Sequence, residues 1–446
     1  MKKYILMPVL GLLTLTAIAQ DFDTEPTLNI ENKEKEVNFT VGARMMADVA
    51  TYHTDFTPLQ SGASITDARI RTSMTYKDWY FYADFGFGGG KFSQKNIFVQ
   101  YAKEDARNNG HYVKAGYYND PAGSMARNTS LGSYHFISRP GVSNALGEGR
   151  ELGVSYKFNN KRFMAYQGVF SENQYNKIEA GFNGVTLGGR YIYRPIADGG
   201  RTLHVGANVR WSHIGGGVVT NNVLKKTLHL GQSMETFVDE DEQFVSCDLP
   251  WINNVFDAGA ELLYQSQKFF VRGEYMYKHT TKKRDSETLW EASNNNIDTW
   301  GSYDWWYAAN PLRSDNFQGG YVEAGFLIFG APYKYNSVEG VLGGIDGKSL
   351  ELVARYNHTN LNDVNDGEYF SVGRNQYYPN GYMADWPYAS SSVGGGKVDS
   401  YTVGLNYSFN KYVQVMFDYT YHHMQKDLLP YDKNIHMGQA RLQFTF

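Results

Sequence analysis

The sequence lacks several features that mark common protein classes. Its 446 residues include a single cysteine, Cys247, and only 12 prolines. A disulfide-stapled scaffold is therefore excluded, because it needs several cysteine pairs. Each span of a helical membrane protein needs roughly 20 near-continuous apolar residues, and the mean hydropathy is −0.48. A protein with many membrane-spanning helices is excluded as well.

An excess of positive charge is also lacking. Lys and Arg number 42 against 46 Asp and Glu, a net charge of −4, so the sequence shows no nucleic-acid-binding footprint. Aromatic residues are abundant instead, at 15% of the chain, with 35 Tyr and 26 Phe. A disordered chain would contain few of them. Length alone suggests about three soluble domains, although large β-architectures can run as one unit.

The first residues predict export from the cytoplasm. Lys2 and Lys3 precede a short apolar stretch that ends in small residues at Ala19, which is the pattern of a secretory signal peptide. We expect a signal peptide over 1–19 and a polar periplasmic lead over 20–36. Cleavage would change the charge balance from −4 to 40 − 46 = −6.

Beyond residue 36 the dominant pattern is alternation with a period of two, which indicates β-strands. In 412–424, for example, every second residue from Val413 to Tyr421 is bulky and apolar or aromatic. Sixteen such segments are predicted, at 37–49, 63–76, 79–87, 95–103, 111–118, 151–158, 162–171, 185–193, 201–211, 256–265, 268–279, 319–329, 348–358, 398–409, 412–424 and 435–446.

The connections between these segments alternate between short and long. Lys77-Asp78 and Asn410-Lys411 are short, whereas the long connections are 119–150, 212–255, 280–318 and 359–397. Short periplasmic turns and long outer loops are typical of outer-membrane barrels, whose strands need about 9 to 11 residues to cross the bilayer. The sequence thus predicts a 16-stranded antiparallel transmembrane β-barrel over 37–446. The connection 330–347 departs from the pattern, because it is long although it lies at the end of the barrel where the turns are short.

The two faces of the predicted strands differ in polarity. One is apolar, with Met45, Val154 and Leu352, and the other carries Arg190, Arg272 and Glu351. In lipid every backbone polar group must be paired internally, so only a closed barrel makes such strands viable. Sixteen strands leave an aqueous channel. Aromatic residues near the strand ends predict interfacial girdles, namely Trp79, Tyr117, Tyr156, Phe158, Tyr191, Tyr193, Trp211, Tyr264 and Tyr277.

Three C-terminal stretches resemble the phosphate-selective porin O and P family. They are LELVARYNHTNLND (350–363), VDSYTVGLNYSFNKYVQVMFDYTYHH (398–423) and ARLQFTF (440–446). The last ends in Phe446, which resembles the signal read by the barrel assembly machinery. The resemblance implies a trimeric channel in the outer membrane of a Gram-negative bacterium, surrounded by outer-membrane lipid and admitting small anions such as phosphate.

In that family, basic residues line the constriction, partly from a third outer loop that folds inward. The corresponding loop here is 119–150. A guanidinium binds a tetrahedral oxyanion through charge-assisted hydrogen bonds, and a ring of cations in a narrow pore favours anions. The pore-lining candidates implied by the resemblance are Arg127, Arg139, Arg150, Arg69, Arg71, Lys114, Arg44, Lys157 and Arg441.

Two alternatives stay open. Acids on the same face are nearly as numerous as the bases, so the channel could also be weakly selective. The barrel could instead act mainly as a surface receptor or adhesin through the long loops 212–255, 280–318 and 359–397, which are rich in Trp and Asn.

No enzyme, metal or cofactor site is indicated by the sequence. It has no nucleophile elbow, and the acidic run 239–242 lacks the spacing and the glycine of a calcium loop. The adjacent His422 and His423 would point to opposite faces of a strand. We expect Cys247 to lie in a loop and to have a structural role.

Overall fold

The computed structural model describes residues 28–54, 59–171, 184–214, 218–219, 223–224, 228–239, 243–249, 252–282, 314–363, 370–371, 392–425 and 434–446. The predicted signal peptide and the first part of the lead lie outside this range. No helix in the described part of the chain is long and apolar enough to cross a membrane.

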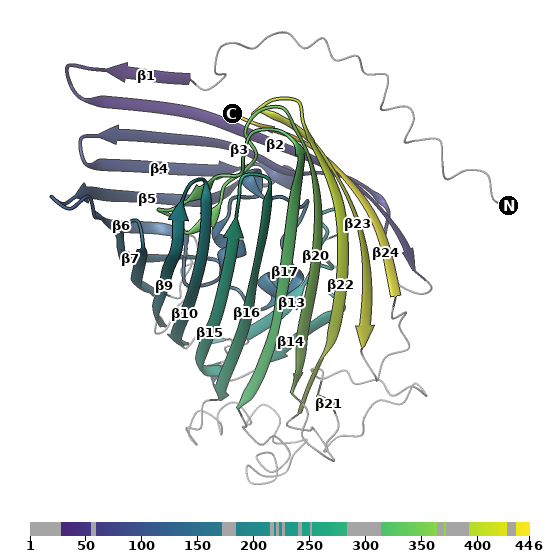
Figure 1. Ribbon diagram of the computed structural model, residues 1–446. Coiled ribbons are helices and arrows are strands. Elements are labelled where there is room, and N and C mark those ends of the chain that lie inside the picture. The colour runs from purple at the N-terminus through teal and green to yellow at the C-terminus, as the bar shows by residue number, and fades with distance from the viewer. Residues whose placement is uncertain are drawn as a thin grey trace.

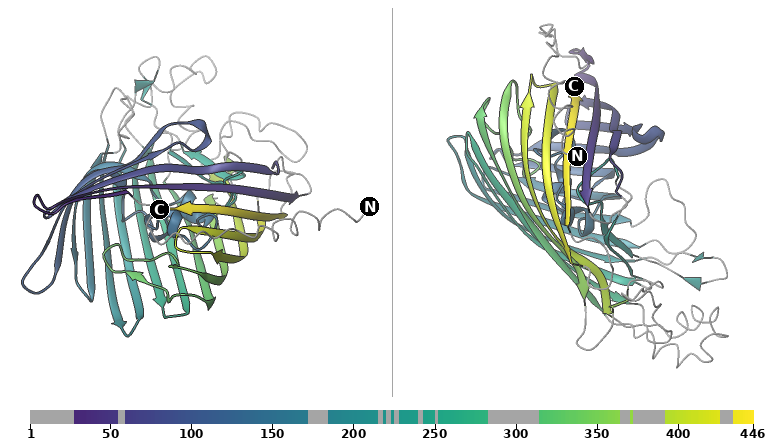
Figure 2. Two further views of the ribbon diagram at one scale, coloured as in Figure 1. Left: turned by 90° about the horizontal axis from the view of Figure 1, so that it is seen from above. Right: turned by 90° about the vertical axis from the view of Figure 1, so that its right-hand side faces the viewer.

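The chain forms a closed antiparallel barrel of 16 strands (Figures 1 and 2). The barrel closes where β2 pairs with β24, from Arg44 opposite Thr445 to Thr54 opposite Ile435. In chain order the strands are β2 (Val37–Thr54), β3 (Gly62–Tyr76), β4 (Trp79–Gly86), β5 (Ser93–Glu104), β6 (Gly110–Asn119), β7 (Arg150–Asn159), β8 (Phe163–Ser171), β9 (Val185–Asp198), β10 (Arg201–His213), β15 (Ile252–Gln265), β16 (Phe269–Lys282), β17 (Asp315–Phe329), β20 (Ser349–Asp363), β22 (Ser392–Ser408), β23 (Val413–Gln425) and β24 (Asn434–Thr445).

These strands confirm the sixteen predicted segments. The suggestion of three domains is wrong, because one continuous ring of paired strands contains the whole barrel. Several strands are longer than predicted, mainly at their outer ends, where polar residues continue the ladder; β22 begins at Ser392 rather than at 398. Within the lead, β1 (Leu28–Asn32) pairs with β2, and β21 (Phe370–Ser371) lies parallel to β22.

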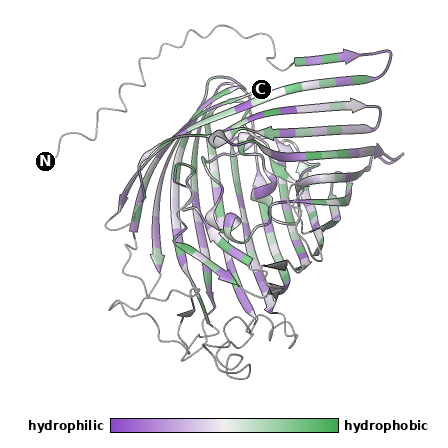
Figure 3. Ribbon diagram, turned by 180° about the vertical axis from the view of Figure 1, so that it is seen from behind, coloured by the Kyte–Doolittle hydropathy of each residue, from purple (hydrophilic) through white to green (hydrophobic). Residues whose placement is uncertain are grey.

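Alternation of hydropathy along the strands separates a lipid-facing surface from the lumen (Figure 3). Val154 and Leu352 face outward and are about half exposed, whereas Arg190, Arg272 and Glu351 face inward and are fully buried. The predicted girdle residues Trp79, Tyr193 and Trp211 are among the exposed aromatics of the outer surface. His422 and His423 point to opposite faces as predicted, since only His422 is buried.

Residues 120–149, which join β6 to β7 and are called the inward loop, fold into the lumen. The loop contains α2 (Met125–Asn128), η3 (Leu131–Ser133) and α3 (Gly141–Ala145). Glu274 on β16 accepts hydrogen bonds from the Met125 amide (2.6 Å) and from the Ser124 hydroxyl (2.9 Å). The Ala126 amide also donates to Glu274, over 3.0 Å. Glu274 thus pairs two amides at the start of α2 that would otherwise lack a partner, and it holds the loop against the far wall.

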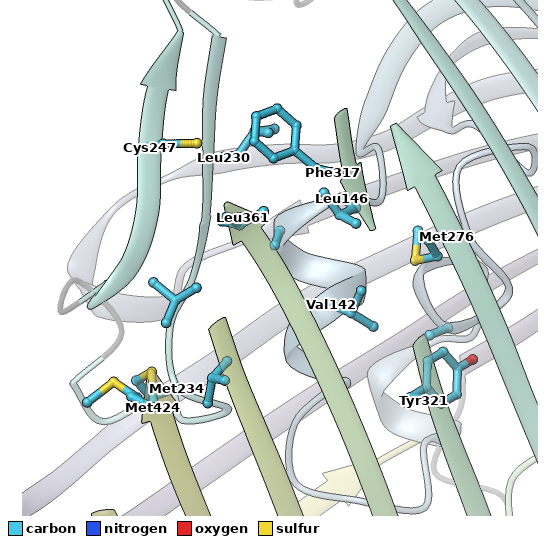
Figure 4. Close-up of a cluster of buried hydrophobic side chains, with 14 of the residues drawn as sticks. Val142, Leu146, Leu230, Met234, Cys247, Met276, Phe317, Tyr321, Leu361 and Met424 are labelled. Carbon is cyan, nitrogen blue, oxygen red and sulfur yellow. The ribbon is translucent and has the colours of Figure 1, made fainter. Parts of the chain in front are cut away.

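A second segment, residues 228–239 and 243–249, also lies inside the barrel and is called the inward hairpin. It pairs β13 (Leu228–Gln232) with β14 (Val245–Leu249), and it packs on α3 and β22. The cluster in Figure 4 fills the space between them with buried side chains, including Val142, Leu230 and Phe317. Cys247 lies on β14 within this cluster, so the prediction that it lies in a loop is wrong. The segment that contains Cys247 forms a hairpin because the alternating apolar residues of β13 and β14 can be buried against the inward loop.

The long connection 330–348, called the inner turn, enters the lumen from the opposite end. It carries β18 (Tyr335–Asn336) and β19 (Val341–Leu342). The Tyr333 hydroxyl donates to Glu351 over 2.6 Å. Its length therefore reflects an extension that packs on the inner wall. Two further short strands, β11 (Val218–Val219) and β12 (Val223–Leu224), pair with each other.

Together these segments cover one side of the lumen more than the other. Inward-facing side chains on β16, β17, β20 and β23, such as Arg272, Glu323 and Asn357, have exposed fractions near zero. Inward-facing side chains on β4, β5 and β6, such as Tyr80, Gln100 and Tyr112, are only partly buried. The remaining open space therefore runs along the wall formed by β4 to β6.

Candidate functional site

Two arginines of the inward loop are held by neutral oxygen atoms. Arg139 donates from Nε to the Ala126 carbonyl and from Nη2 to the Thr129 carbonyl, both over 2.8 Å. Arg127 donates to the Ser143 carbonyl over 3.3 Å. Both side chains are only partly buried. Among the described residues, no carboxylate forms an ion pair with either arginine, although Glu148 acts on Arg127 from a greater distance and raises its pKa against the lowering by burial.

The barrel wall facing them adds two more cations. Arg150 at the start of β7 donates from Nε to the side chain of Asn96 on β5 over 2.7 Å. Lys95 on β5 lies near Arg150. Its side chain passes over Gly86 on β4, so closely that a Cβ on Gly86 would lie 2.7 Å from the lysine Cε. Among the described residues, no carboxylate forms an ion pair with either. We call Lys95, Arg127, Arg139 and Arg150 the basic arc.

The charges of the arc act on one another. The pKa of Arg139 is lowered to about 9, first by burial and then by Arg127, with smaller effects of Arg150 and Arg44. Burial also lowers the pKa of Arg127. Because a guanidinium stays protonated at neutral pH, the arc retains its charge there. An anion entering it would relieve the mutual repulsion.

Four of the predicted pore-lining residues are neutralised by carboxylates. Arg441 forms two hydrogen bonds with Asp48, of 2.6 and 2.7 Å. Lys157 reaches Glu339 of the inner turn over 2.8 Å. Two others share one partner: Arg44 bonds Asp67 through Nε over 2.6 Å, and Arg69 bonds both Asp67 (2.6 Å) and Asp84 (2.9 Å).

The remaining two predicted residues have no such partner in the described part of the chain. The Lys114 ammonium lies over the rings of Phe98 (4.5 Å) and Tyr118 (5.2 Å), a cation–π arrangement that leaves the charge in place. Arg71 donates to the Phe446 carbonyl over 3.1 Å. Both therefore extend the positive wall beyond the basic arc.

On the covered side of the lumen, bases and acids compensate one another. Arg190 pairs bidentately with Glu261, and Arg272 pairs with Glu323. Arg210 contacts Asp120, Glu148, Glu151 and Asp257. Lumen acids and bases are therefore nearly equal in number, as the sequence indicates. They compensate one another on the covered side of the lumen, whereas the basic arc on the open side has no such partners among the described residues.

Lys95 is the member of the arc that the sequence reasoning missed. Strict alternation from Phe98 and Gln100 would place Lys95 on the lipid face. A register shift between Ala83 and Phe85 on the neighbouring strand brings Lys95 to the lumen instead. Lys95 is the third residue of β5, and a lysine near a strand end on the lipid face costs little, so alternation alone carries no strong signal of this bulge.

Other sequence features fall only partly within the described range. Asp239 accepts a hydrogen bond from the Gln60 amide over 2.8 Å, whereas 240–242 lie outside the described residues. The same holds for 283–313 and 372–391, which form most of two proposed receptor loops. Within the described residues, no group of three or more His, Cys, Asp or Glu side chains is placed to hold a metal ion.

Comparison with known proteins identifies relatives at the level of a family and of a fold. The family model described as phosphate-selective porin O and P matches residues 39–446. No curated protein matches the chain.

Three solved structures illustrate the likeness in fold. The anion-selective porin from Comamonas acidovorans has a TM-score of 0.53 and 10% identity, over 92% of this chain and 100% of that one. A loop L8 deletion mutant of OmpT from Vibrio cholerae gives 0.51 and 10%, over 92% and 100%. OprB from Pseudomonas putida gives 0.50 and 9%, over 93% and 95%.

Proposed function

Because the chain belongs to the phosphate-selective porin O and P family, and is thus an outer-membrane channel of a Gram-negative bacterium, we propose that it conducts phosphate and other small anions in preference to cations. The observation that carries this proposal is the basic arc. Its four cations lack carboxylate partners among the described residues and line the side of the lumen that the inward segments leave open.

The proposed mechanism is passive. An anion enters the channel and meets Arg127 and Arg139 on the inward loop, with Lys95 and Arg150 on the facing wall. Their donors replace part of its hydration shell through charge-assisted hydrogen bonds. Because four separate side chains share the anion, no single contact needs to be tight, and the ion can leave as readily as it enters.

Several features of the mature protein belong to the same proposal. We propose that residues 1–19 are removed on export, that three copies assemble, and that the outward-facing Phe446 is read by the barrel assembly machinery. The barrel acts as a channel without catalysis. A surface receptor or adhesin role remains a second candidate, motivated by the long loops, and loop deletion that abolishes ligand binding but spares conductance would support it.

The selectivity can be measured in planar bilayers. Purified, folded protein is placed between a concentrated and a dilute KCl solution, and the voltage at zero current is recorded. We expect its sign to report chloride as the more permeable ion, and we expect added inorganic phosphate to reduce the chloride current. A potential that reports potassium preference would show that the basic arc does not control permeation, and absence of any conductance would exclude a channel.

A further inference from the structure

Histidines collect at the outer border of the barrel, the end at which the long loops emerge. The outer-border pairs are His213 with Asn254, His279 with Asn316, His358 with Asp399, His423 with Asn434, and His53 with His436. All six histidines lie near the outer ends of their strands, and none is fully buried. They are called the histidine belt.

The belt is built from a repeated sequence pattern. In four strands an aromatic residue precedes the histidine by two positions, so that both face lipid. The pairs are Trp211 with His213, Tyr277 with His279, Tyr356 with His358, and Tyr421 with His423. The alternation thus places each histidine just beyond the aromatic girdle, toward the loops.

Three of these pairs have the same hydrogen-bond geometry. One side-chain oxygen on the next strand binds both the tyrosine hydroxyl and Nδ1 of the histidine. The distances to it are 2.6 and 2.8 Å for Tyr277 and His279 at Asn316, 2.7 and 2.8 Å for Tyr356 and His358 at Asp399, and 2.6 and 2.9 Å for Tyr421 and His423 at Asn434.

This geometry determines which ring nitrogen is available. A carboxylate oxygen such as that of Asp399 can only accept, so Nδ1 of His358 carries the hydrogen. Among the described residues, none forms a hydrogen bond with Nε2 of these three histidines. On protonation Nε2 becomes a charged donor, the property by which histidine serves as a pH-dependent group in proteins.

The outer and inner borders of the barrel differ in how many histidines face outward. Aromatic side chains occupy both, as interfacial girdles do, and Trp79, Tyr193 and Phe269 lie at the inner border. Among the described histidines, only His111 faces outward there. A girdle needs no histidine, so the asymmetry indicates a ligand that one leaflet offers and the other does not.

Among the described residues, few acids oppose a positive charge at the belt. Asp399 lies between His358 and His423, and Lys397 is two residues farther along the same strand. Behind His279, Asp363 accepts a hydrogen bond from Asn316. The neighbours of the other histidines are neutral or are themselves histidines, since His213 faces Asn254, and His436 faces His53 and the Tyr419 hydroxyl.

We propose that the histidine belt binds phosphate groups of lipid headgroups in the outer leaflet, and that binding strengthens as the pH falls. Each protonated Nε2 donates a charge-assisted hydrogen bond to a phosphate oxygen, while the aromatic residue below it packs against the upper acyl chain. The belt thereby anchors the barrel to anionic lipid at one border only.

The test uses the full chain in vesicles of phosphatidylcholine containing 20% phosphatidylglycerol, whose single charge stays constant between pH 5.5 and 8. Spin-labelled versions of the two lipids report, by electron paramagnetic resonance, which one is immobilised at the barrel perimeter. We expect phosphatidylglycerol to be favoured at pH 5.5 by about threefold to fivefold, the order of effect of one basic side chain at an anionic surface. The preference should fall toward one at pH 8.

A variant with His279→Gln, His358→Gln and His423→Gln removes half of the belt and should lower the preference at pH 5.5, because glutamine keeps the approximate size and hydrogen-bonding capacity without the charge. The control, His111→Gln at the inner border, should keep it. Equal preference at both pH values in the unchanged protein, or a preference that the triple substitution leaves unchanged, would overturn the proposal. The pH comparison alone decides the matter if the variant does not fold.

Discussion

At the scale of single residues, the lumen divides its cations by whether a carboxylate lies against them. Arg441 and Lys157 are compensated by Asp48 and Glu339, and their charges hold the wall and the inner turn together. Lys95 and Arg150 have no such partner among the described residues and border the open space. Only the second group can attract a mobile anion, because a charge already paired offers little net field.

Lys95 gives the cleanest residue-level prediction, since no described side chain forms a hydrogen bond or ion pair with it. Lys95→Gln should reduce the anion-to-cation permeability ratio by about two- to fivefold in dilute salt, because two unit charges 4 Å apart in water interact by about 1 kcal/mol. In 1 M salt, where the screening length is about 3 Å, the difference should nearly disappear.

Reversal potentials at the two salt concentrations provide the measurement. Lys77→Gln, in the exposed turn between β3 and β4, removes the same charge from outside the lumen and serves as the control. If both variants shift the ratio equally, or if neither does, Lys95 does not face the permeating ion.

At the scale of structural elements, the width of the channel depends on the docking of the inward hairpin. Glu235, in its turn, bonds Arg355 on β20 and the Gly141 amide of the inward loop, each over 2.8 Å, and Ser400 on β22 over 3.0 Å. One buried carboxylate therefore joins the hairpin, the inward loop and two strands. Its loss should loosen all three contacts together.

We predict that Glu235→Gln raises the single-channel conductance and adds rapid fluctuations to it. Removing one member of a buried ion pair costs about 3–5 kcal/mol, enough to release a short hairpin while the barrel stays closed. Asp248→Asn, on the exposed face of β14 where the carboxylate contacts only His229, should leave the conductance unchanged. An unaltered conductance trace for Glu235→Gln would show that the hairpin does not limit flow.

Acid should reproduce this effect in the unchanged protein. Burial raises the pKa of Glu235, but the charges of Arg355 and His422 and the hydrogen bonds from Gly141 and Ser400 together lower it by more, so the pKa lies below its usual range. The stabilisation is therefore complete above the pKa of an unfolded glutamate, about 4.3, and is lost as the pH falls through the lowered pKa. Conductance recorded from pH 6 downward should begin to fluctuate only below about pH 4.3, whereas Glu235→Gln should fluctuate throughout.

At the scale of the whole molecule, the chain ends determine barrel closure. The backbone of Phe446 exchanges hydrogen bonds of 2.8 and 2.9 Å with Ala43. The close approach of the two strands at this point requires a glycine at position 42, since a Cβ on Gly42 would lie 2.5 Å from the Phe446 carbonyl oxygen. The Phe446 side chain itself faces outward and is 39% exposed, so it is available for recognition.

Phe446→Ser separates closure from recognition, because it keeps the backbone bonds and removes only the aromatic ring. We predict that the variant refolds in detergent like the unchanged protein but reaches the outer membrane of cells in much lower amount. Heat-modifiable migration in gels reports the folded fraction in both settings. Normal assembly in cells would show that the ring is not read, and failure in detergent would show that it is needed for the barrel itself.

The sequence by itself determined the strands, their faces and the class of protein. Period-two alternation is local, and a lipid-facing strand tolerates few exceptions, so residues such as Val413 and Phe417 indicate their own environment. The tertiary structure alone decided which lumen cations remain uncompensated. Arg441 meets Asp48 393 positions away, and a bulge brings Lys95 inward. Alternation tells which side of the wall a charge lies on, but only the closed barrel and its inward segments decide what lies opposite it.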